Sequence, residues 1–316
     1  MATKKATKTT SSRSSTKKAA PKKAVKKTNT KVTTLKAKAS KKPAKTIKLS
    51  GNNETANIVL AEFVGTFVLT MVALLSIGEV LPLYVGLTLA LLVMSIGAVS
   101  GSHVNPAVTF GLWSARKVKG ALVPFYWIAQ FIGAMAAFVA LQIASVSFGG
   151  FFEGKGAILS FDHFGSFNMG MFALEMVATA VFLLGIVMVT SRKDFTDGAK
   201  AVGVGLSLFV AILLSMGLTN SMQAGADTSN VSQEIDDKGQ QKLVGVPHEI
   251  RTGGATLNPA IALAVNEKTD SQLRGSKSPA KNEKLYSRLS LEVIFGTLIG
   301  AALGGNLALL ISRKKD

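Results

Sequence analysis

Residues 100–110 read Ser-Gly-Ser-His-Val-Asn-Pro-Ala-Val-Thr-Phe, and residues 253–262 read Gly-Gly-Ala-Thr-Leu-Asn-Pro-Ala-Ile-Ala. Each stretch places Asn-Pro-Ala directly after a glycine-containing bend. An asparagine N-cap followed by proline at the first helical position is typical of the start of a helix. The sequence therefore predicts two short helices, each with its positive end and an amide group at the start. The two triplets are Asn105, Pro106 and Ala107, and Asn258, Pro259 and Ala260.

The composition indicates that these short helices lie within a membrane. The chain has 316 residues, of which 48% are hydrophobic, and its mean hydropathy is +0.35. Six segments reach the roughly 20 apolar residues that a membrane-spanning helix needs. Their apolar runs are continuous, whereas the strands of a membrane β-barrel alternate. An all-α membrane protein is therefore predicted. The segments are approximately residues 56–78, 81–99, 121–148, 168–190, 201–219 and 287–312.

Basic residues between the predicted spans indicate their orientation. Clusters of Lys and Arg follow the second, fourth and sixth spans, on the same side as the N-terminal segment. Because cytoplasmic loops carry the excess of Lys and Arg, we expect this side, and both termini, to be cytoplasmic. The first short helix would then enter from the cytoplasmic face and the second from the outer face. The clusters are Arg116, Lys117 and Lys119; Arg192, Lys193 and Lys200; and Arg313, Lys314 and Lys315.

The two halves of the chain resemble each other. Residues 61–69 and 174–183 share the pattern Glu-x-x-x-Thr, starting at Glu62 and Glu175. With three spans in each half, the halves must have opposite orientations, which predicts an inverted repeat. The two glutamates are 113 residues apart and the two triplet asparagines 153 apart, so the second half holds about 40 extra residues. Most of them lie in a polar stretch, residues 220–252, expected outside.

Three spans carry one acidic residue each, namely Glu62, Glu175 and Glu292. A carboxylate in hydrocarbon is costly, so we expect Glu62 and Glu175 to face the protein interior and to accept hydrogen bonds there. A proton relay is the alternative role for this pair. Glu292 lies near the start of the sixth span and is expected to reach the outer interface.

With these motifs, residues 56–312 resemble the aquaporin and glycerol-facilitator family, the major intrinsic proteins. The resemblance implies six transmembrane helices and two re-entrant half-helices that meet at a pore lined by Asn105 and Asn258. It also implies that Glu62 and Glu175 brace the half-helix loops, and that the protein is a homotetramer with one pore in each subunit. In the alternative interpretation, the asparagines are only N-caps.

The expected selectivity filter departs from the family pattern. The resemblance places it at Val85, Ile212, Ala255 and Ile261. Family members usually have arginine at the last position, and water-selective members have histidine at the second. The apolar set favours glycerol and similar small neutral solutes with some water flux; a water-selective or a broader small-solute channel is the alternative. Arg251 is the basic residue expected to lie near enough to replace the missing arginine, unless it is only a solvated charge at the rim.

The N-terminal segment, residues 1–50, has a different character. Residues 1–53 contain 16 Lys, one Arg and no acid, so they hold 17 of the formal net charge of +18. With few large aliphatic residues the segment cannot bury enough apolar surface to fold, and we expect a disordered cytoplasmic arm. A solvated charge run, binding to anionic lipid and binding to nucleic acid are open roles, the last two making a membrane anchor. A targeting presequence is a further possibility.

The residue types argue against an enzyme. The chain has no cysteine and three histidines, which are His103, His163 and His248. None has a spacing to serine or carboxylates that suggests a catalytic triad or a metal site. We therefore expect no catalytic residue, no metal and no cofactor, and expect the partners to be small neutral solutes, the bilayer and copies of the chain.

Overall fold

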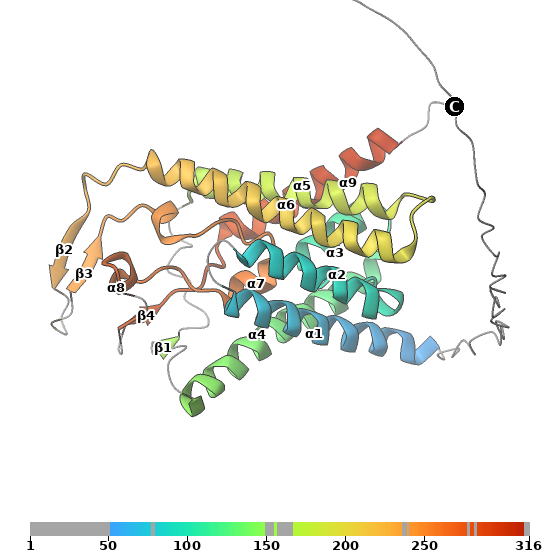
Figure 1. The fold of residues 1–316 in the computed structure, drawn as a ribbon, viewed down its shortest axis with the longest axis horizontal. Helices are drawn as coiled ribbons and strands as arrows, with labels where there is room; N and C mark the ends of the chain where they lie inside the picture. The colour runs from blue at the N-terminus through green and yellow to red at the C-terminus, as the bar shows by residue number, and fades with distance from the viewer. Residues whose placement is uncertain are drawn as a thin grey trace, which may run out of the picture. The chain divides into compact units, whose positions relative to one another are not determined.

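The computed structural model describes residues 51–76, 80–148, 155–156, 167–235, 239, 241–276, 279–280 and 283–312 (Figure 1). All of them belong to one compact unit, residues 48–316. The predicted disordered arm and the basic cluster Arg313, Lys314 and Lys315 lie outside the described residues.

Six helices of the described residues are long and apolar enough to cross a membrane, which confirms the prediction of six spans. The continuous apolar runs explain them, because a helix satisfies its own backbone hydrogen bonds where water is absent. The helices are α1 (Gly51–Leu75), α2 (Leu81–Ser100), α4 (Val123–Phe148), α5 (Met169–Thr190), α6 (Asp197–Ala224) and α9 (Leu291–Ser312).

Three helix starts differ from the predicted spans by four residues or more. Helix α1 begins at Gly51 instead of residue 56. Helix α6 begins at Asp197 instead of residue 201, because the Thr196 side chain accepts a hydrogen bond from the backbone of Ala199 and caps it. Helix α9 begins at Leu291 instead of residue 287, because Ser287 forms a β-bridge with Asn266. The differences at α6 and α9 arise from hydrogen bonds that hydropathy does not detect.

Shorter elements connect the long helices. Helices α3 (Pro106–Ser114) and α7 (Pro259–Ala264) are the two predicted short helices. The others are the helix α8 (Asp270–Leu273), the 3-10 helices η2 (Gly120–Leu122) and η4 (His248–Arg251), the antiparallel strands β2 (Ser232–Ile235) and β3 (Gln241–Val244), and the parallel strands β1 (Lys155–Gly156) and β4 (Lys284–Leu285).

The long helices pack in pairs, α1 with α4, α5 with α9 and α2 with α6. At the α2–α6 crossing, a Cβ atom added at Gly86 would meet the carbonyl oxygen of Gly205, and one added at Gly205 would meet that of Gly86. This reciprocal contact joins the second span of one half to the second span of the other. It is the arrangement that an inverted repeat produces at its symmetry axis.

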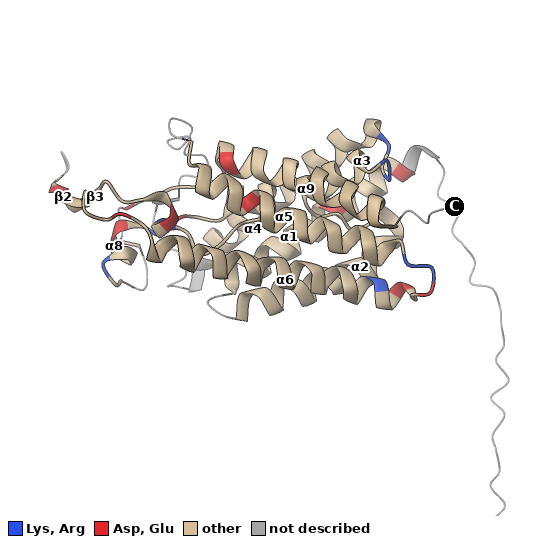
Figure 2. Cartoon of the chain, turned by 90° about the horizontal axis from the view of Figure 1, so that it is seen from above, with Lys and Arg blue, Asp and Glu red and all other residues tan. Residues whose placement is uncertain are grey.

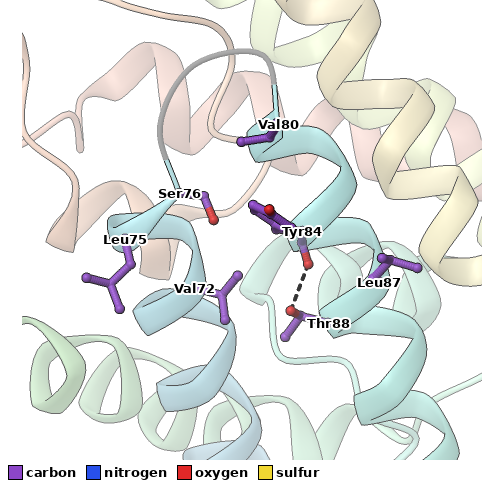
Figure 3. Close-up of a pocket in the computed structure, with 7 residues that line it drawn as sticks. All are labelled: Val72, Leu75, Ser76, Val80, Tyr84, Leu87 and Thr88. Atoms are coloured by element: carbon purple, nitrogen blue, oxygen red, sulfur yellow. Dashed lines mark hydrogen bonds between the residues drawn. The ribbon is translucent and has the colours of Figure 1, made fainter.

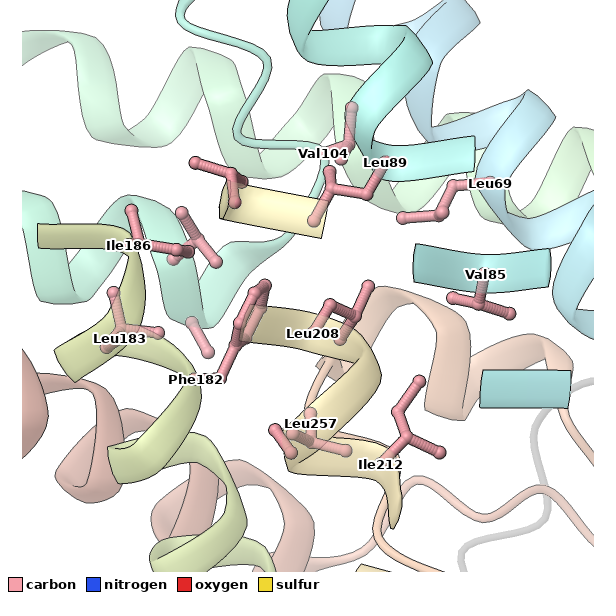
Figure 4. Packing of buried hydrophobic residues seen from close by; sticks show 14 of the residues in the cluster. Leu69, Val85, Leu89, Val104, Phe182, Leu183, Ile186, Leu208, Ile212 and Leu257 are labelled. Atoms are coloured by element: carbon pink, nitrogen blue, oxygen red, sulfur yellow. The ribbon is translucent and has the colours of Figure 1, made fainter. Parts of the chain in front are cut away.

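The outer surface of the helices suits lipid. Large apolar side chains are exposed along them, as at Leu87 and Leu91 of α2, which are 59% and 62% exposed. Figure 2 shows that the Lys and Arg residues of the described part lie near the ends of the long helices. Inside, one apolar cluster joins α1, α2, α5 and α6 to the loops before α3 and α7 (Figure 4).

Candidate functional site

Helices α3 and α7 begin in the same way. Asn105 has an extended backbone and its side-chain oxygen accepts a 2.8 Å hydrogen bond from the backbone N–H of Ala107. Asn258 is also extended and accepts bonds of 3.0 Å and 3.4 Å from Ala260 and Ile261. Each asparagine thus satisfies N–H groups that would lack a partner at a helix start.

The two asparagines also tie the halves of the chain together. The Asn105 amide donates a 2.8 Å hydrogen bond to the Leu257 carbonyl, and the Asn258 amide donates a 3.0 Å bond to the Val104 carbonyl. Each acceptor is the residue that precedes the opposite asparagine. An amide nitrogen carries two N–H groups, so one on each asparagine remains for a further acceptor.

Glu62 of α1 holds the loop that precedes α3. The carboxylate is fully buried and accepts hydrogen bonds from the backbone N–H groups of His103 (2.9 Å) and Val104 (2.7 Å). Ser100 and Gln130 donate to it as well, at 2.6 Å and 2.7 Å. Four donors on one carboxylate offset much of the cost of burying its charge.

Glu175 of α5 has the same role before α7. It is fully buried and accepts from the backbone N–H groups of Thr256 (2.7 Å) and Leu257 (2.9 Å), and from the Thr256 hydroxyl. In both loops the bonded residues are the two before the asparagine. Val104 (φ 44°) and Leu257 (φ 56°) adopt left-handed backbone conformations there. Such strain persists only where surrounding contacts enforce it, and the carboxylates supply those contacts.

The four expected filter residues belong to or pack against one apolar cluster. Val85, Ile212 and Ile261 are buried members of it, and Ala255 is half-buried against it. Val85 and Ile212 are labelled in Figure 4, on α2 and α6. The four residues thus come from four separate elements and share one cluster, which also extends to Leu69 of α1 and Ile186 of α5.

A cavity of about 380 Å³ leads to the loop before α3. Apolar side chains of α2, α3, α5 and α6 form its walls, and Gly101, Ser102 and His103 form part of its lining. Lys117 and Thr190, at the ends of the adjoining segments, also line it. The cavity therefore reaches from the end of the helices to within two residues of Asn105.

A second hollow, of about 600 Å³, lies between α1 and α2 near Val80 and Tyr84 (Figure 3). Leu75 and Leu87, which also line it, are exposed on the outer surface. No predicted site residue lines this hollow, so it is separate from the candidate site.

Arg251, the residue expected to replace the missing arginine, is bound by residues of a neighbouring segment. Its guanidinium forms a 2.7 Å ion pair with Asp270 and donates to the Lys268 carbonyl. Its side chain is 18% exposed and ion-paired, so it is not a freely solvated charge.

Sequence reasoning missed Arg288, a buried basic residue bonded to the loop before α7. It is 7% exposed and its Nη1 donates a 2.5 Å hydrogen bond to the carbonyl of Gly254, the neighbour of Ala255. Its Nη2 lies 3.7 Å from Glu175. The available signal was a basic residue at the start of the sixth apolar segment. Burial lowers the pKa of Arg288, and the carboxylates of Glu175 and Glu267 oppose that change.

The expectation for Glu292 was also wrong. The residue is 1% exposed instead of reaching the interface, and it accepts a 2.6 Å hydrogen bond from the backbone N–H of Asn168. Asn168 caps α5, so Glu292 of α9 fixes the start of its neighbouring helix. Among the described residues, no group of three or more His, Cys, Asp or Glu side chains could hold a metal ion.

Comparison with known proteins agrees with this geometry. Residues 50–227 match the family model described as Major intrinsic protein. Aquaporin Z of Photorhabdus laumondii is 35% identical over 180 residues, covering 51% of this chain and 77% of that protein. Glycerol uptake facilitator protein-like 6 of Lactiplantibacillus plantarum is 33% identical over 167 residues, covering 51% and 76%.

A solved structure, the aquaglyceroporin from Plasmodium falciparum, is similar in fold. The match covers 82% of this chain and 97% of that protein's chain, with a TM-score of 0.48 and 18% identity.

The fold and the site define a multi-pass helical membrane protein with two opposed half-helices. On the match of the family model, which covers more than half of the chain, it belongs to the major intrinsic protein family. It is therefore a channel for water or small neutral solutes and not an enzyme. An aquaporin and a glycerol uptake facilitator match this chain at similar identity, so the comparison does not decide which solute the channel conducts.

Proposed function

We propose that this channel conducts glycerol and similar small polyols passively, with some water. The observation that carries the proposal is that the expected filter is apolar: Val85, Ile212 and Ile261 are buried in one apolar cluster, and Ala255 packs against it. An apolar ring favours solutes with a carbon backbone, because bare apolar walls disfavour water alone. A water-selective or a broader small-solute channel remains the competing outcome of the experiment below.

The half-helices support passage of neutral solutes. Each triplet asparagine has one N–H group left to orient the oxygen of a solute, after its bond to the opposite half. The loops before them supply backbone carbonyls as acceptors. Both half-helices direct their positive ends toward this region, which opposes the entry of cations.

The test is stopped-flow shrinkage and reswelling of proteoliposomes in water, glycerol, urea and larger polyols. We expect glycerol permeability well above that of protein-free liposomes and a cut-off at larger polyols. Fast water flux with background glycerol flux would contradict the proposal in favour of a water-selective channel. Equal permeability to all solutes, including the larger polyols, would favour the broader channel.

We further propose that the channel lies in the cell membrane with both termini in the cytoplasm, and that it assembles as a homotetramer. The shared side of the basic clusters supports the orientation. Protease protection of an N-terminal tag in inside-out and right-side-out vesicles tests it. Native mass spectrometry from detergent micelles tests the assembly, and a monomer as the main species there would contradict it.

A further inference from the structure

Among the described residues, Arg288 is a buried cation near the expected filter that the two half-helix triplets do not explain. We propose that Arg288 is the cationic element of the constriction, where it donates a hydrogen bond to the oxygen of a passing solute and repels cations, including protons. This inference rests on the proposed passage of neutral solutes. It concerns a residue 27 positions beyond the expected filter position Ile261 in the sequence.

The backbone around Arg288 is attached to helix α7. The backbone N–H of Arg288 donates a 2.9 Å hydrogen bond to the carbonyl of Val265, the residue that ends α7. The hydroxyl of Ser287 donates to the carbonyls of Ala262 and Leu263 within α7, at 3.0 Å and 3.1 Å. The segment that carries Arg288 is thus fixed to the same short helix that carries Ile261.

The side chain then reaches back past that helix to the loop before it. Nη1 binds the Gly254 carbonyl, and Gly254 precedes the filter residue Ala255. A Cβ atom added at Gly254 would lie 3.1 Å from the Ser215 hydroxyl and 3.4 Å from Met216 of α6. These residues follow Ile212 by about one helical turn. Both the loop and α6 therefore place the guanidinium at the level of the filter.

One part of the guanidinium, the buried Nη2, lacks a hydrogen-bond partner among the described residues, although it forms a 3.7 Å ion pair with Glu175. A buried N–H group without a partner costs about 1–3 kcal/mol, so such groups are normally paired. A solute hydroxyl or carbonyl oxygen in the constriction would supply the missing acceptor. In an otherwise apolar ring, this donor would also replace a hydrogen bond that the polyol loses when it leaves water.

The carboxylates near Arg288 also interact with other residues. Glu175 already accepts hydrogen bonds from Thr256 and Leu257, and its distance from Nη2 is 3.7 Å. Glu267 contacts His248. An arginine remains protonated at neutral pH, so a positive charge is present at the constriction in addition to the helix ends.

The test measures glycerol flux and proton leak in the same proteoliposomes, which contain a pH-sensitive dye. We expect Arg288→Gln to raise the proton leak at least several-fold while the vesicles still take up glycerol. Arg251→Gln is the matched control, because that arginine is held by Asp270 in the outer loops, and it should leave the leak unchanged. In Ile261→Arg/Arg288→Gln, the leak should return to the wild-type level. A folded Arg288→Gln protein with wild-type leak would overturn the proposal.

A second measurement does not depend on that variant folding. Since the chain has no cysteine, Ala255→Cys introduces a single thiol at the constriction of an otherwise intact protein. Methanethiosulfonate reagents of opposite charge then report the local potential, when each rate is divided by the rate of the same reagent with a free thiol. On this normalised scale, the anionic reagent should react several-fold faster than the cationic one. Equal rates, or a faster cationic reagent, would overturn the inference. Failure of the wild type to conduct glycerol would instead refute the proposed function, and the thiol rates would still decide the place of the charge.

Discussion

Single residues hold the two half-helix loops in place, and each does so through several hydrogen bonds at once. A buried carboxylate is bound by backbone donors in each loop, and a triplet asparagine caps one half-helix while bonding to the opposite loop. The backbone strain at Val104 and Leu257 is retained because these bonds outweigh it. Substitutions that keep the shape of such a residue and change its donors or acceptors therefore test its role.

Glu62→Gln keeps the volume of the side chain and removes its charge. If the Oε2 oxygen becomes the NH₂ group, it can accept neither the hydrogen bond from Val104 nor the one from Gln130. Hydrogen bonds to charged groups contribute about 1.5–3 kcal/mol each, so we expect the free energy of unfolding to fall by about 2 kcal/mol or more. Thermal unfolding in detergent micelles measures this change. Glu54→Gln, at an exposed position of the same helix, is the control; an equal decrease in both variants would contradict the prediction.

Asn258→Asp separates the two functions of a triplet asparagine. The remaining oxygen still accepts from Ala260 and caps α7, but the carboxylate cannot donate to Val104 or to a solute. Loss of one hydrogen bond of about 0.5–1.5 kcal/mol predicts a decrease in glycerol flux of about two- to thirteenfold. The added negative charge should raise the leak of cations.

Stopped-flow and dye measurements on the Asn258→Asp vesicles check both effects. Thr196→Asp is the control because it changes the N-cap of α6 outside the site. Unchanged flux and leak in Asn258→Asp would show that the amide only caps its helix.

At the scale of elements, the close pairing of helices depends on glycines. Three glycines of α9, four residues apart, face backbone carbonyls of α5 that are also four residues apart. Small residues at this spacing let two helices approach closely in lipid, where packing replaces the hydrophobic effect between helices. The pairs are Gly296 with Phe172, Gly300 with Met176, and Gly304 with Ala180.

Gly300→Ala should separate α5 from α9. The added methyl group would overlap the backbone of Met176, and overpacking of this kind costs about 1–3 kcal/mol. At Gly217 of α6, an added Cβ would meet no described atom within 4 Å, so alanine there should stabilise the helix by up to about 1 kcal/mol. The two thermal midpoints should therefore move in opposite directions. A shift of both in the same direction would argue against a tight contact at Gly300.

At the scale of the whole molecule, a nearly neutral membrane unit follows a polycationic segment. The channel elements all lie within residues 51–312, and the proposed conduction uses none of the first 50 residues. Basic residues near an anionic membrane contribute about 1 kcal/mol each. The segment and the channel are therefore expected to act independently.

Deletion of residues 2–48 tests this independence. We expect the flux of glycerol per protein to remain within about twofold of the full chain, because the helices and both half-helices are intact. Binding of the detergent-solubilised protein to anionic vesicles should become much weaker and less dependent on salt. Loss of flux with normal assembly would instead show that the segment takes part in conduction.

The sequence by itself determined the local features of this protein. Apolar runs predicted the six spans, and Asn-Pro at Asn105 and Asn258 predicted the two half-helix starts, because hydropathy and N-caps act over a few neighbouring residues. The repeated Glu-x-x-x-Thr pattern predicted the inverted halves. These features needed no knowledge of distant contacts.

Only the tertiary structure decided which residues meet across those halves. The bonds of Asn105 to Leu257 and of Asn258 to Val104 join segments more than 150 residues apart. Arg288 reaches Gly254 across 34 positions that include α7, α8 and β4, whereas Arg251, closer in sequence to α7, is held by Asp270. No periodicity or spacing encodes such contacts, because they depend on how loops without regular structure fold back onto the half-helices.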